Sequence, residues 1–448
     1  MHTIHAPFST AASQTARLPT KNALLSWCLF WLPTLLILSA IVIPDFEPRH
    51  AQSAAGVEVE SDLAATMATE NSVRESAFLL NLLALGATGA TLFVFAGRSG
   101  RRPGSFQLWL IVATLAFTAS SLLWSDDRSL TFRRLVIASC FVAGAWGIGR
   151  AWRPMQLVHM VLLLSSLFAI SGILAEIYFG TFMAADGYRF SGFLHPNRQA
   201  LSCGLFVLAA MTMKAKTGNH FYWLLAAIGF ALLIMTGSRG GAAACAIAVV
   251  FQLTLAAPAA QRVAWGMLGC MLIGGGLLFF ALEPNGGRRL EALAKMGRSD
   301  ALADPKSLTG RIPIWAEMSV GIQQTPAIGH GYAAYWTPQR IHRLSYIHDW
   351  EFNNAHSSYL EILLSLGVVG FTLGMTGVLS VFSRGLQLNA HTPDWGLVFI
   401  LSVFVMATIS GLIESIFVSV GYEFLVWLIG AFMIVYYSLP TRGEGRLG

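Results

Sequence analysis

Long apolar runs dominate the sequence, and the first of them, Ala23–Ile43, contains no charged residue. A helix of that length spans a bilayer, because each helical residue advances about 1.5 Å and the hydrocarbon core is about 30 Å thick. The composition agrees, since 55% of the 448 residues are hydrophobic and 12% are charged, whereas soluble domains carry roughly a quarter charged residues. The sequence therefore predicts an all-α, polytopic integral membrane protein, and not a soluble protein with a large core.

About twelve transmembrane helices are predicted. Several of the apolar runs are short, so either their boundaries shift by several residues or these helices are tilted, broken or partly shielded by their neighbours. The predicted spans are residues 23–43, 76–96, 105–124, 135–149, 156–180, 199–213, 221–236, 242–259, 263–282, 357–382, 396–415 and 423–438. The resulting segments are a tail at 1–22, transmembrane helices 1–9 within 23–282, one large loop at 283–356, helices 10–12 within 357–438, and a tail at 439–448.

The distribution of Lys and Arg predicts the orientation of the chain. The positive-inside rule assigns the short connections that are richer in these residues to the cytoplasm. In this sequence the richer connections alternate with poorer ones, beginning with the N-terminal tail. Both termini are therefore expected in the cytoplasm, and the 283–356 loop is expected on the opposite, outer face.

The large loop has the composition of a folded segment, because its Trp and Tyr residues supply apolar surface for packing. One helix is predicted to begin near Thr309 or Gly310, with Pro313 in its first turn, where a missing N–H costs nothing. This helix is expected to lie flat on the membrane surface with one apolar side. That side is predicted to consist of Ile312, Trp315, Val320 and Ile322.

Several arginines at the predicted outer face go against the positive-inside rule, which indicates that they meet an anionic group, and Arg239 and Arg189 are the clearest cases. Arg239 lies in the short connection between two apolar runs. An arginine at membrane depth costs on the order of 2.5–3.5 kcal/mol, so it should have a partner; a snorkelling side chain in a tight turn is the alternative. Arg189 precedes the span at 199–213 at a distance that gives it no capping role. His195 and Asn197 flank Pro196 at the start of that span, where helix capping is the alternative to ligand binding.

Three segments carry a family resemblance. They are Gly310-Arg311 with Trp315, then Pro326–Gly331, and then Asn354–Glu361 followed by Leu366–Gly370. Their order and spacing resemble the signature of the O-antigen ligase and Wzy-type polysaccharide polymerase family. The resemblance extends over roughly 189–370 and implies a GT-C-like bundle of helices.

The resemblance also implies a function. The family moves a glycan from an undecaprenyl diphosphate carrier to a sugar hydroxyl on the periplasmic side of the bacterial inner membrane. The reaction serves either polymerisation of exopolysaccharide or O-antigen, or ligation of O-antigen to lipid A core. The expected partners are this donor, a glycan or lipid A core acceptor, membrane lipids and other polysaccharide assembly proteins, and no nucleic acid is expected.

Residue roles follow from the same resemblance, which implies catalytic functions for Arg189, Arg239 and His356. Arginine suits a diphosphate because it donates two parallel hydrogen bonds and stays charged, so it can stabilise the leaving group without a metal. His356 is the expected general base, since imidazole has an ordinary pKa of about 6.5; capping of the following helix is the alternative. The further expected substrate-binding residues are Arg311, His195, Asn197, His330 and Asn354.

Neither a cofactor nor a metal is expected, because the outer face offers no Asp-x-Asp pair. Asp126-Asp127, followed by Arg128, is typical of a solvated loop. Two other classes remain open, a twelve-helix transporter and a non-catalytic polysaccharide assembly subunit. The transporter is disfavoured because the carboxylates of the apolar runs lie toward their ends and not at mid-membrane. These carboxylates are Glu176, Glu361, Glu414 and Glu423.

Overall fold

Every regular element in the described part of the chain is a helix, as predicted. The computed structural model describes residues 21–39, 78–96, 104–183, 188–258, 261–264, 266–267, 269, 311–348, 354–418 and 420–437. The first elements are α1 (Lys21–Ile37), a helix over 78–91 that continues as η2 (Leu92–Ala96), α4 (Ser105–Ser120), η3 (Ser121–Leu123), α5 (Arg128–Ala151), α6 (Pro154–Tyr178), α7 (Pro196–Thr217), α8 (Phe221–Met235) and α9 (Arg239–Ala256). After these come α12 (Arg311–Gln324), α13 (Pro338–His348), α14 (Ser358–His391), α15 (Trp395–Ser410) and α16 (Tyr422–Tyr436).

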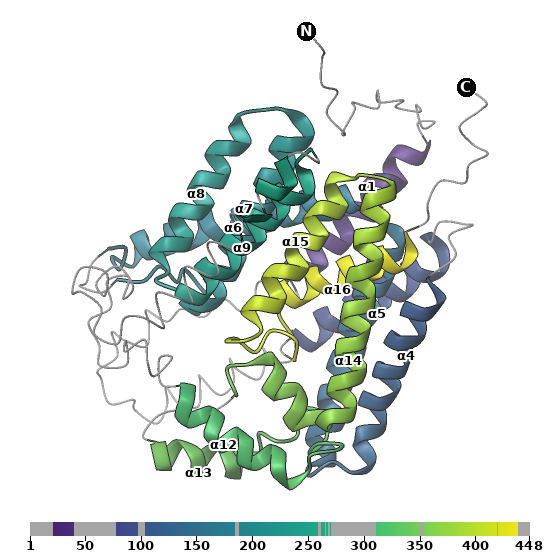
Figure 1. Cartoon of the computed structure of the whole chain (residues 1–448), viewed down its shortest axis with the longest axis vertical. Coiled ribbons are helices and arrows are strands. Elements are labelled where there is room, and N and C mark those ends of the chain that lie inside the picture. The colour runs from purple at the N-terminus through teal and green to yellow at the C-terminus, as the bar shows by residue number, and fades with distance from the viewer. Residues whose placement is uncertain are drawn as a thin grey trace.

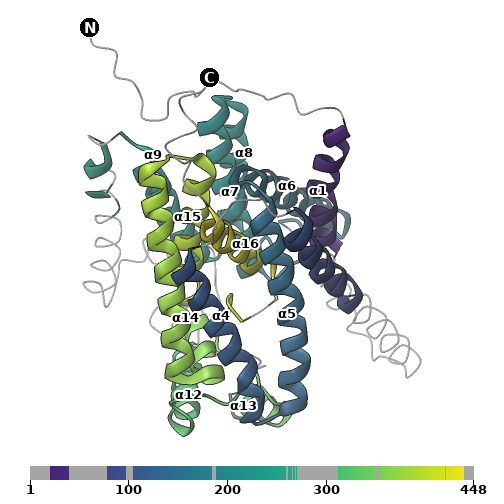
Figure 2. The same ribbon diagram turned by 90° about the vertical axis from the view of Figure 1, so that its right-hand side faces the viewer.

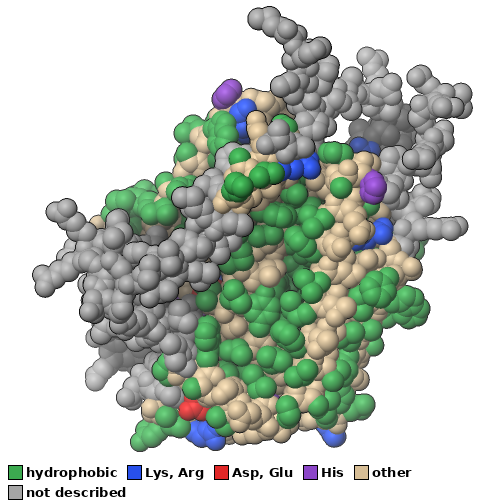
Figure 3. Space-filling view, in the orientation of Figure 1, with side chains coloured by type: hydrophobic (Ala, Val, Ile, Leu, Met, Phe, Trp, Pro, Cys, Tyr) green, Lys and Arg blue, Asp and Glu red, His purple; other side chains and the backbone are tan. Residues whose placement is uncertain are grey.

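The helices agree in position with the predicted spans. A helix lies over each span except 263–282, most of which falls outside the described residues. Among the described helices, six are long and apolar enough to cross a bilayer. Figure 3 shows hydrophobic side chains over the middle of one face, with charged side chains near its two ends. The chain is therefore a multi-pass membrane protein, while the total of twelve spans stays a prediction.

The predicted span at 199–213 is shorter than the helix that contains it, because α7 continues past the apolar run at both ends. In α7, every residue from Gln199 to Met213 is buried, and the helix packs against α6, α8, α9 and α15. A helix that is buried on all sides over this length lies inside the protein and not against lipid. Helix α7 is therefore surrounded by these four helices, next to which it lies in Figure 1.

The two helices from the large loop lie across one end of the bundle, here called the α12 end (Figure 1). In Figure 2 the neighbouring helices α4 and α14 run together from this end toward the other. The connections α6–α7, α8–α9 and α15–α16 are linked to one another and to the start of α14 by hydrogen bonds.

Helix α12 has Pro313 in its first turn as predicted, whereas Thr309 and Gly310 lie outside the described residues. Its predicted apolar side is correct in part, because Trp315 and Ile322 are partly buried against the core of this region. The fully buried side chains are Ile314 and Met318, and Val320 is exposed. The reason is that α12 does not lie free on a membrane surface: it packs against α14, and the i, i+4 spacing of its two buried residues faces that helix.

Candidate functional site

The start of α14 is interrupted, and a loop from the α12 end fills the interruption. Gly367 has φ 61° and ψ −168°, so the helical hydrogen bonds around it are open. In an unbroken helix, the amides of Val368 and Val369 would bond to the carbonyls of Leu364 and Ser365. Instead, those two amides donate to the carbonyls of Pro326 and Ala327.

The two carbonyls that the interruption releases are also satisfied by the loop. The amides of His330 and Gly331 donate to the carbonyls of Leu364 and Ser365, at 2.8 and 3.0 Å. Four hydrogen bonds to residues 326–331 thus replace two helical ones, and the four backbone groups that the interruption releases all have partners. The motifs Pro326–Gly331 and Leu366–Gly370 are two halves of one interlocked structure, here called the α14 joint.

Glycine is required at the α14 joint because the two backbones touch. A Cβ on Gly329 would lie 2.5 Å from the backbone of Ser365 and Leu366, and a Cβ on Gly367 would overlap the backbone of Ala327. Both glycines have positive φ. The glycine-rich character of the two motifs follows from this close approach.

Asp126 ties the same loop to the connection between α4 and α5. Its Oδ2 lies 2.9 Å from His330 Nδ1 and 3.0 Å from Arg340 Nη2. The neighbouring Asp127 caps α5, where its Oδ1 accepts from the amide of Leu130. Asp126 and Asp127 lie in a loop as predicted, and Asp126 is exposed. Both carboxylates also have structural partners, which lie far away in the sequence or in the next helix.

His330 belongs to the support of the site. It is 2% exposed, and its Nε2 lies 3.0 Å from the carbonyl of Gly321 while its Nδ1 faces Asp126. A carbonyl oxygen only accepts, so Nε2 must carry a proton. Both ring nitrogens are therefore committed to groups inside the protein, which favours a structural role over the predicted substrate contact.

The segment that precedes α14 is held by a buried carboxylate. Glu361 is 3% exposed; its Oε1 accepts from the amide of Ala355 at 2.6 Å, and both of its oxygens lie 3.0 Å from Trp336 Nε1. On the other side, Trp315 Nε1 donates to the carbonyl of Ala355. The residue before His356 is thus fixed on both its amide and its carbonyl.

His356 lies in a strained backbone position next to this anchor. Its φ is 46°, in the left-handed region, where a side chain other than glycine costs about 1–3 kcal/mol unless the surroundings impose it. Its amide donates to Asn354 Oδ1 at 2.9 Å. The N-cap position of α14 is held by Ser357 and not by His356, so the capping alternative for His356 does not account for its position.

Arg189 reaches across to the connection that carries Arg239. Its Nε donates to the carbonyl of Thr236 at 2.8 Å, and its Nη2 donates to Asn197 Oδ1 at 3.0 Å. The carbonyl that Arg189 bonds lies in the turn Thr236–Ser238, which leads directly into α9, and Arg239 is the first residue of that helix. The two arginines predicted from sequence are thus brought to the same connection.

A second buried carboxylate holds the Arg189 segment from behind. Glu176, which is 1% exposed, accepts from the amides of Ser191 and Gly192 at 3.0 and 2.8 Å and from the hydroxyl of Tyr188. Burial and the bond to Glu176 raise the pKa of the Tyr188 hydroxyl, which therefore stays protonated. Arg189 lies between Tyr188 and Ser191, so this carboxylate sets the course of its backbone.

The connection between α15 and α16 joins the arginine segments to the histidine segment. Asn197 Nδ2 donates to Glu414 Oε1 at 2.8 Å. The carbonyl of Glu414 accepts from both the amide and the hydroxyl of Ser358, at 3.1 and 2.8 Å. Ser415 Oγ donates to Asn354 Oδ1 at 3.4 Å. Residues 411–418 are here called the hub connection.

Arg239 is also next to the hub connection. A Cβ built on its neighbour Gly240 would overlap Ile413 Cδ1, so the start of α9 and the side chain of Ile413 are in close contact. The structure thus brings five of the predicted site residues around one connection. These residues are Arg189, Asn197, Arg239, Asn354 and His356.

The remaining predicted residues have other placements. His195 is the N-cap of α7, and its Nδ1 accepts from the amide of Asn197 at 3.2 Å, so it takes the capping role considered as the alternative. Arg311 begins α12, and its side chain lies outside the described residues. Among the described residues, no group of three or more His, Cys, Asp or Glu side chains is arranged to hold a metal ion.

Sequence reasoning missed the carboxylates that organise the site. In the sequence, Glu176, Glu361 and Glu414 stand out only as charges near helix ends, yet each one fixes a segment that carries a predicted site residue. The available signal was their number at the ends of apolar helices, next to arginines that needed partners. Which carboxylate serves which segment depends on contacts between distant parts of the chain and requires the fold.

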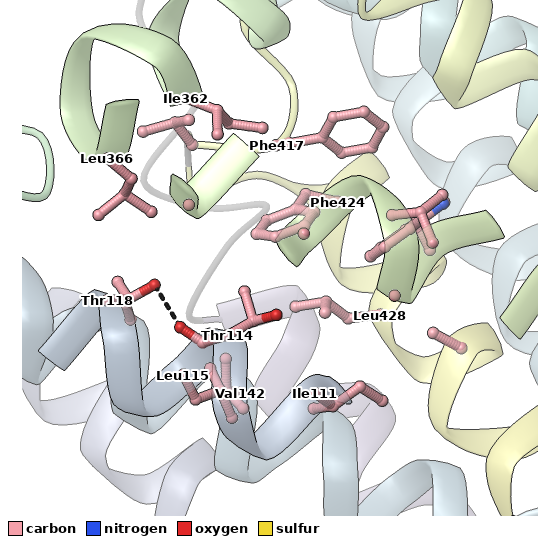
Figure 4. Close-up of a pocket in the computed structure, with 18 of the residues that line it drawn as sticks. Ile111, Thr114, Leu115, Thr118, Val142, Ile362, Leu366, Phe417, Phe424 and Leu428 are labelled. Carbon is pink, nitrogen blue, oxygen red and sulfur yellow. Dashed lines mark hydrogen bonds between the residues drawn. The ribbon is translucent and has the colours of Figure 1, made fainter. Parts of the chain in front are cut away.

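An apolar groove lies beside the polar site. It has a volume of about 230 Å³ and is bounded by α4, α5, α14, α16 and the hub connection. Figure 4 shows Thr114 and Thr118 on one wall, with Phe424 and Leu428 facing them. The hydroxyls of both threonines donate to carbonyls of their own helix, so they add little polarity to the groove.

Two residues link the groove to the polar site. Phe417 lines the groove and belongs to the hub connection. Tyr359, three residues after His356 in the sequence, also lines the groove. At the same boundary, burial raises the pKa of Tyr332 to about 12, so its hydroxyl stays neutral near physiological pH. The arrangement therefore combines an apolar groove with a polar site that carries arginines, which suits an amphiphile with an anionic head group.

The fold and this arrangement define a multi-pass membrane protein with a polar site at one end of its helix bundle. Residues 224–375 match the family model Wzy_C, described as O-Antigen ligase. The match confirms the predicted resemblance and includes Arg239, Asn354 and His356, whereas Arg189 and Glu414 lie outside the matched residues. No curated protein matches the sequence. The family match supports membrane glycan ligation or polymerisation as the general function.

Proposed function

We propose that the protein is a metal-independent glycosyltransferase of the bacterial inner membrane. It moves a glycan from undecaprenyl diphosphate to a sugar hydroxyl at the periplasmic side, in polysaccharide polymerisation or in O-antigen ligation. The observation that carries the proposal is that the hub connection lines the apolar groove through Phe417 and also bonds, through Glu414, to the segments that carry Arg189 and His356.

The groove is suited to the lipid part of the donor. Its lining is almost entirely hydrocarbon and aromatic, so an isoprenoid chain that moves from the bilayer into the groove keeps apolar surroundings and is held there by van der Waals packing. A carrier held in the groove near Phe417 has its diphosphate at the level of the hub connection. The groove then recognises the carrier by its lipid tail, and the polar site acts on its diphosphate head group.

The arginines are suited to the leaving group. Arg189 is oriented by two hydrogen bonds, to the Thr236 carbonyl and to Asn197, so little reorganisation is needed when an anion binds. As the bond between the glycan and the diphosphate breaks, negative charge grows on the diphosphate, and preorganised guanidinium groups stabilise it. Arg239 acts from the start of α9, where the N-terminal end of the helix also favours an anion.

His356 is suited to the acceptor. Its backbone is held in place by Asn354 and by the anchored Ala355, which limits the positions that the imidazole can take. The ring accepts the proton of the attacking sugar hydroxyl, and the oxygen attacks the anomeric carbon as the diphosphate leaves. General-base catalysis of this kind contributes typically 10²–10⁴-fold to a rate.

Deletion of the gene, followed by gel analysis of envelope and secreted glycans, tests the general function. Loss of a polymerase leaves single repeat units, and loss of a ligase leaves bare lipid A core. A deletion strain with unchanged glycans would contradict the proposal. Purified protein should keep its turnover in excess EDTA, and activity that disappears and returns with magnesium would contradict metal independence.

The orientation is tested by fusions to alkaline phosphatase, which is active only outside the cytoplasm. A fusion after residue 320 should be active, and a fusion after residue 390 should be inactive. The reverse pattern would place the polar site on the cytoplasmic side, where a lipid-linked donor is not required.

A further inference from the structure

We infer that Glu414 is a positioning residue that sets Arg189 relative to His356. The inference rests on the proposed function, because it assigns the donor to Arg189 and the acceptor to His356. Glu414 lies outside the residues that match the family model and is joined through its side chain to one segment and through its backbone to the other.

The side chain of Glu414 orients Arg189 through Asn197. An arginine can only donate and an ionised carboxylate can only accept, so the two ends of the Asn197 amide cannot be exchanged. Its Nδ2 must face Glu414 Oε1, at 2.8 Å, and its Oδ1 must face Arg189 Nη2, at 3.0 Å. The carboxylate therefore determines which end of the amide is presented to the arginine.

The backbone of Glu414 fixes the histidine segment. Its carbonyl accepts from the amide and the hydroxyl of Ser358, and the same hydroxyl accepts from the amide of Ile416 at 2.7 Å. Ser358 follows His356 after a single residue. A shift of the hub connection would therefore move the donor arginine and the acceptor base relative to each other.

The consequence for catalysis is geometric. Transfer requires that the attacking hydroxyl and the anomeric carbon be held close together and aligned, and a misplacement of about 1 Å can cost about 10²-fold in rate. Glu414 touches neither substrate in this scheme. It acts by keeping two separately anchored segments at one separation.

A reciprocal exchange tests the inference. Asn197→Asp places a carboxylate against Glu414 and removes the donor between them, although the new carboxylate can still accept from Arg189. Combining it with Glu414→Gln restores a donor, since the glutamine amide that replaces the Glu414 carboxylate can donate to the new carboxylate at position 197. We expect Asn197→Asp to lower turnover by about 10- to 100-fold, and the double variant to recover to within about fivefold of Glu414→Gln alone.

Glu414→Ala should raise the KM for the donor and lower kcat together, while the melting temperature in detergent stays within a few degrees of the wild type. Asp394→Asn is the matched control, because Asp394 caps the opposite end of α15 through an acceptor oxygen that Asn also provides. It should leave both kinetic constants unchanged. A Glu414→Ala protein with wild-type kinetics, or a double variant no better than Asn197→Asp, would overturn the inference.

Binding of undecaprenyl diphosphate separates this inference from the proposed function. If the wild-type protein binds this lipid but transfers no glycan, the proposed reaction is wrong. The wild type, the two single variants and the double variant are then compared by their affinity for the lipid alone. In that case Asn197→Asp should weaken binding of undecaprenyl diphosphate, and the double variant that combines it with Glu414→Gln should restore that binding. Failure of the restoration in affinity would reject the role of Glu414 independently of the reaction.

Discussion

The α14 joint and the hub connection hold the same site by different means. The α14 joint is made of backbone hydrogen bonds between residues 326–331 and the interruption at Gly367, and it requires glycine where the two chains touch. The hub connection works mainly through side chains, with Asn197, Glu414 and Ser358 as its links.

This difference explains what each region leaves in the sequence. A backbone joint needs particular glycines at fixed spacing, so it appears as a short motif that can be recognised, and both of its halves lie within the residues that match the family model. A side-chain hub needs only one suitable group from each of several distant segments. The joint should therefore tolerate no added side chain, whereas the hub should lose function without losing its fold.

The largest expected effect is that of Gly367→Ala. The backbone of Gly367 lies in a region essentially restricted to glycine, and a Cβ there would overlap the backbone of Ala327. We expect a loss of about 3 kcal/mol or more in the free energy of unfolding, measured as a fall in melting temperature in detergent together with loss of transfer.

Gly374→Ala is the matched control for the melting temperature in the same helix, because nothing lies within 4 Å of a Cβ at that position; its transfer is not compared, since Gly374 lines the groove. The variant should be neutral or stabilise the helix by up to about 1 kcal/mol. If the two variants had equal melting temperatures, the α14 joint would not need glycine. The contrast between a backbone joint and a side-chain hub would then be wrong.

The next effect should come from His356→Ala and should be confined to the chemistry. Turnover should fall by about 10²–10⁴-fold, while affinity for undecaprenyl diphosphate and the melting temperature change little. His342→Ala on α13 is the control, since that histidine is exposed on the surface of the loop. Transfer at a near-normal rate by the His356→Ala protein would remove the base from the proposal.

Arg239→Ala should produce a smaller loss, shared between binding and rate. Charge-assisted hydrogen bonds contribute about 1.5–3 kcal/mol each, which corresponds to roughly 10- to 100-fold in donor affinity, and Arg239→Lys should restore only part because lysine cannot form the paired bonds. Arg343→Ala, at an exposed position on α13, should be neutral. If Arg239→Ala instead unfolded the protein as Gly367→Ala does, the hub would be structural in the same sense as the joint.

Most of the fold could be predicted from the sequence because lipid imposes a simple rule. Each apolar run of sufficient length must be helical, so α5, α6 and α14 could be located by composition alone. The apolar side of α12 could be predicted only in part in this way. Its fully buried residues Ile314 and Met318 pack in a cluster with Leu364 of α14, and composition does not specify a contact between such distant segments.

The candidate site could be predicted in its cations but not in its anions. Arg189 and Arg239 are conspicuous at the predicted outer face, because the positive-inside rule makes them exceptions. Glu176, Glu361 and Glu414 are unremarkable near the ends of helices, where a carboxylate costs little. Their importance comes from which segments they join, and a single sequence does not specify those long-range pairs.

The smallest expected effect distinguishes the groove from both regions. The Thr118 hydroxyl donates to the carbonyl of Thr114 in its own helix, at 2.8 Å, so the groove gains little polarity from it. Thr118→Val keeps the shape of the side chain and should change affinity for undecaprenyl diphosphate by less than about threefold, because the apolar contact area is conserved.

Thr118→Asp is the contrasting variant, because it has a similar size but brings a charge into an apolar groove, which is costly without a partner. It should weaken binding of undecaprenyl diphosphate by more than about tenfold, and affinities measured in lipid nanodiscs decide the point. Equal affinities for the two variants would mean that the lipid chain lies elsewhere, and the polar site would then have to be matched to another apolar surface of the bundle.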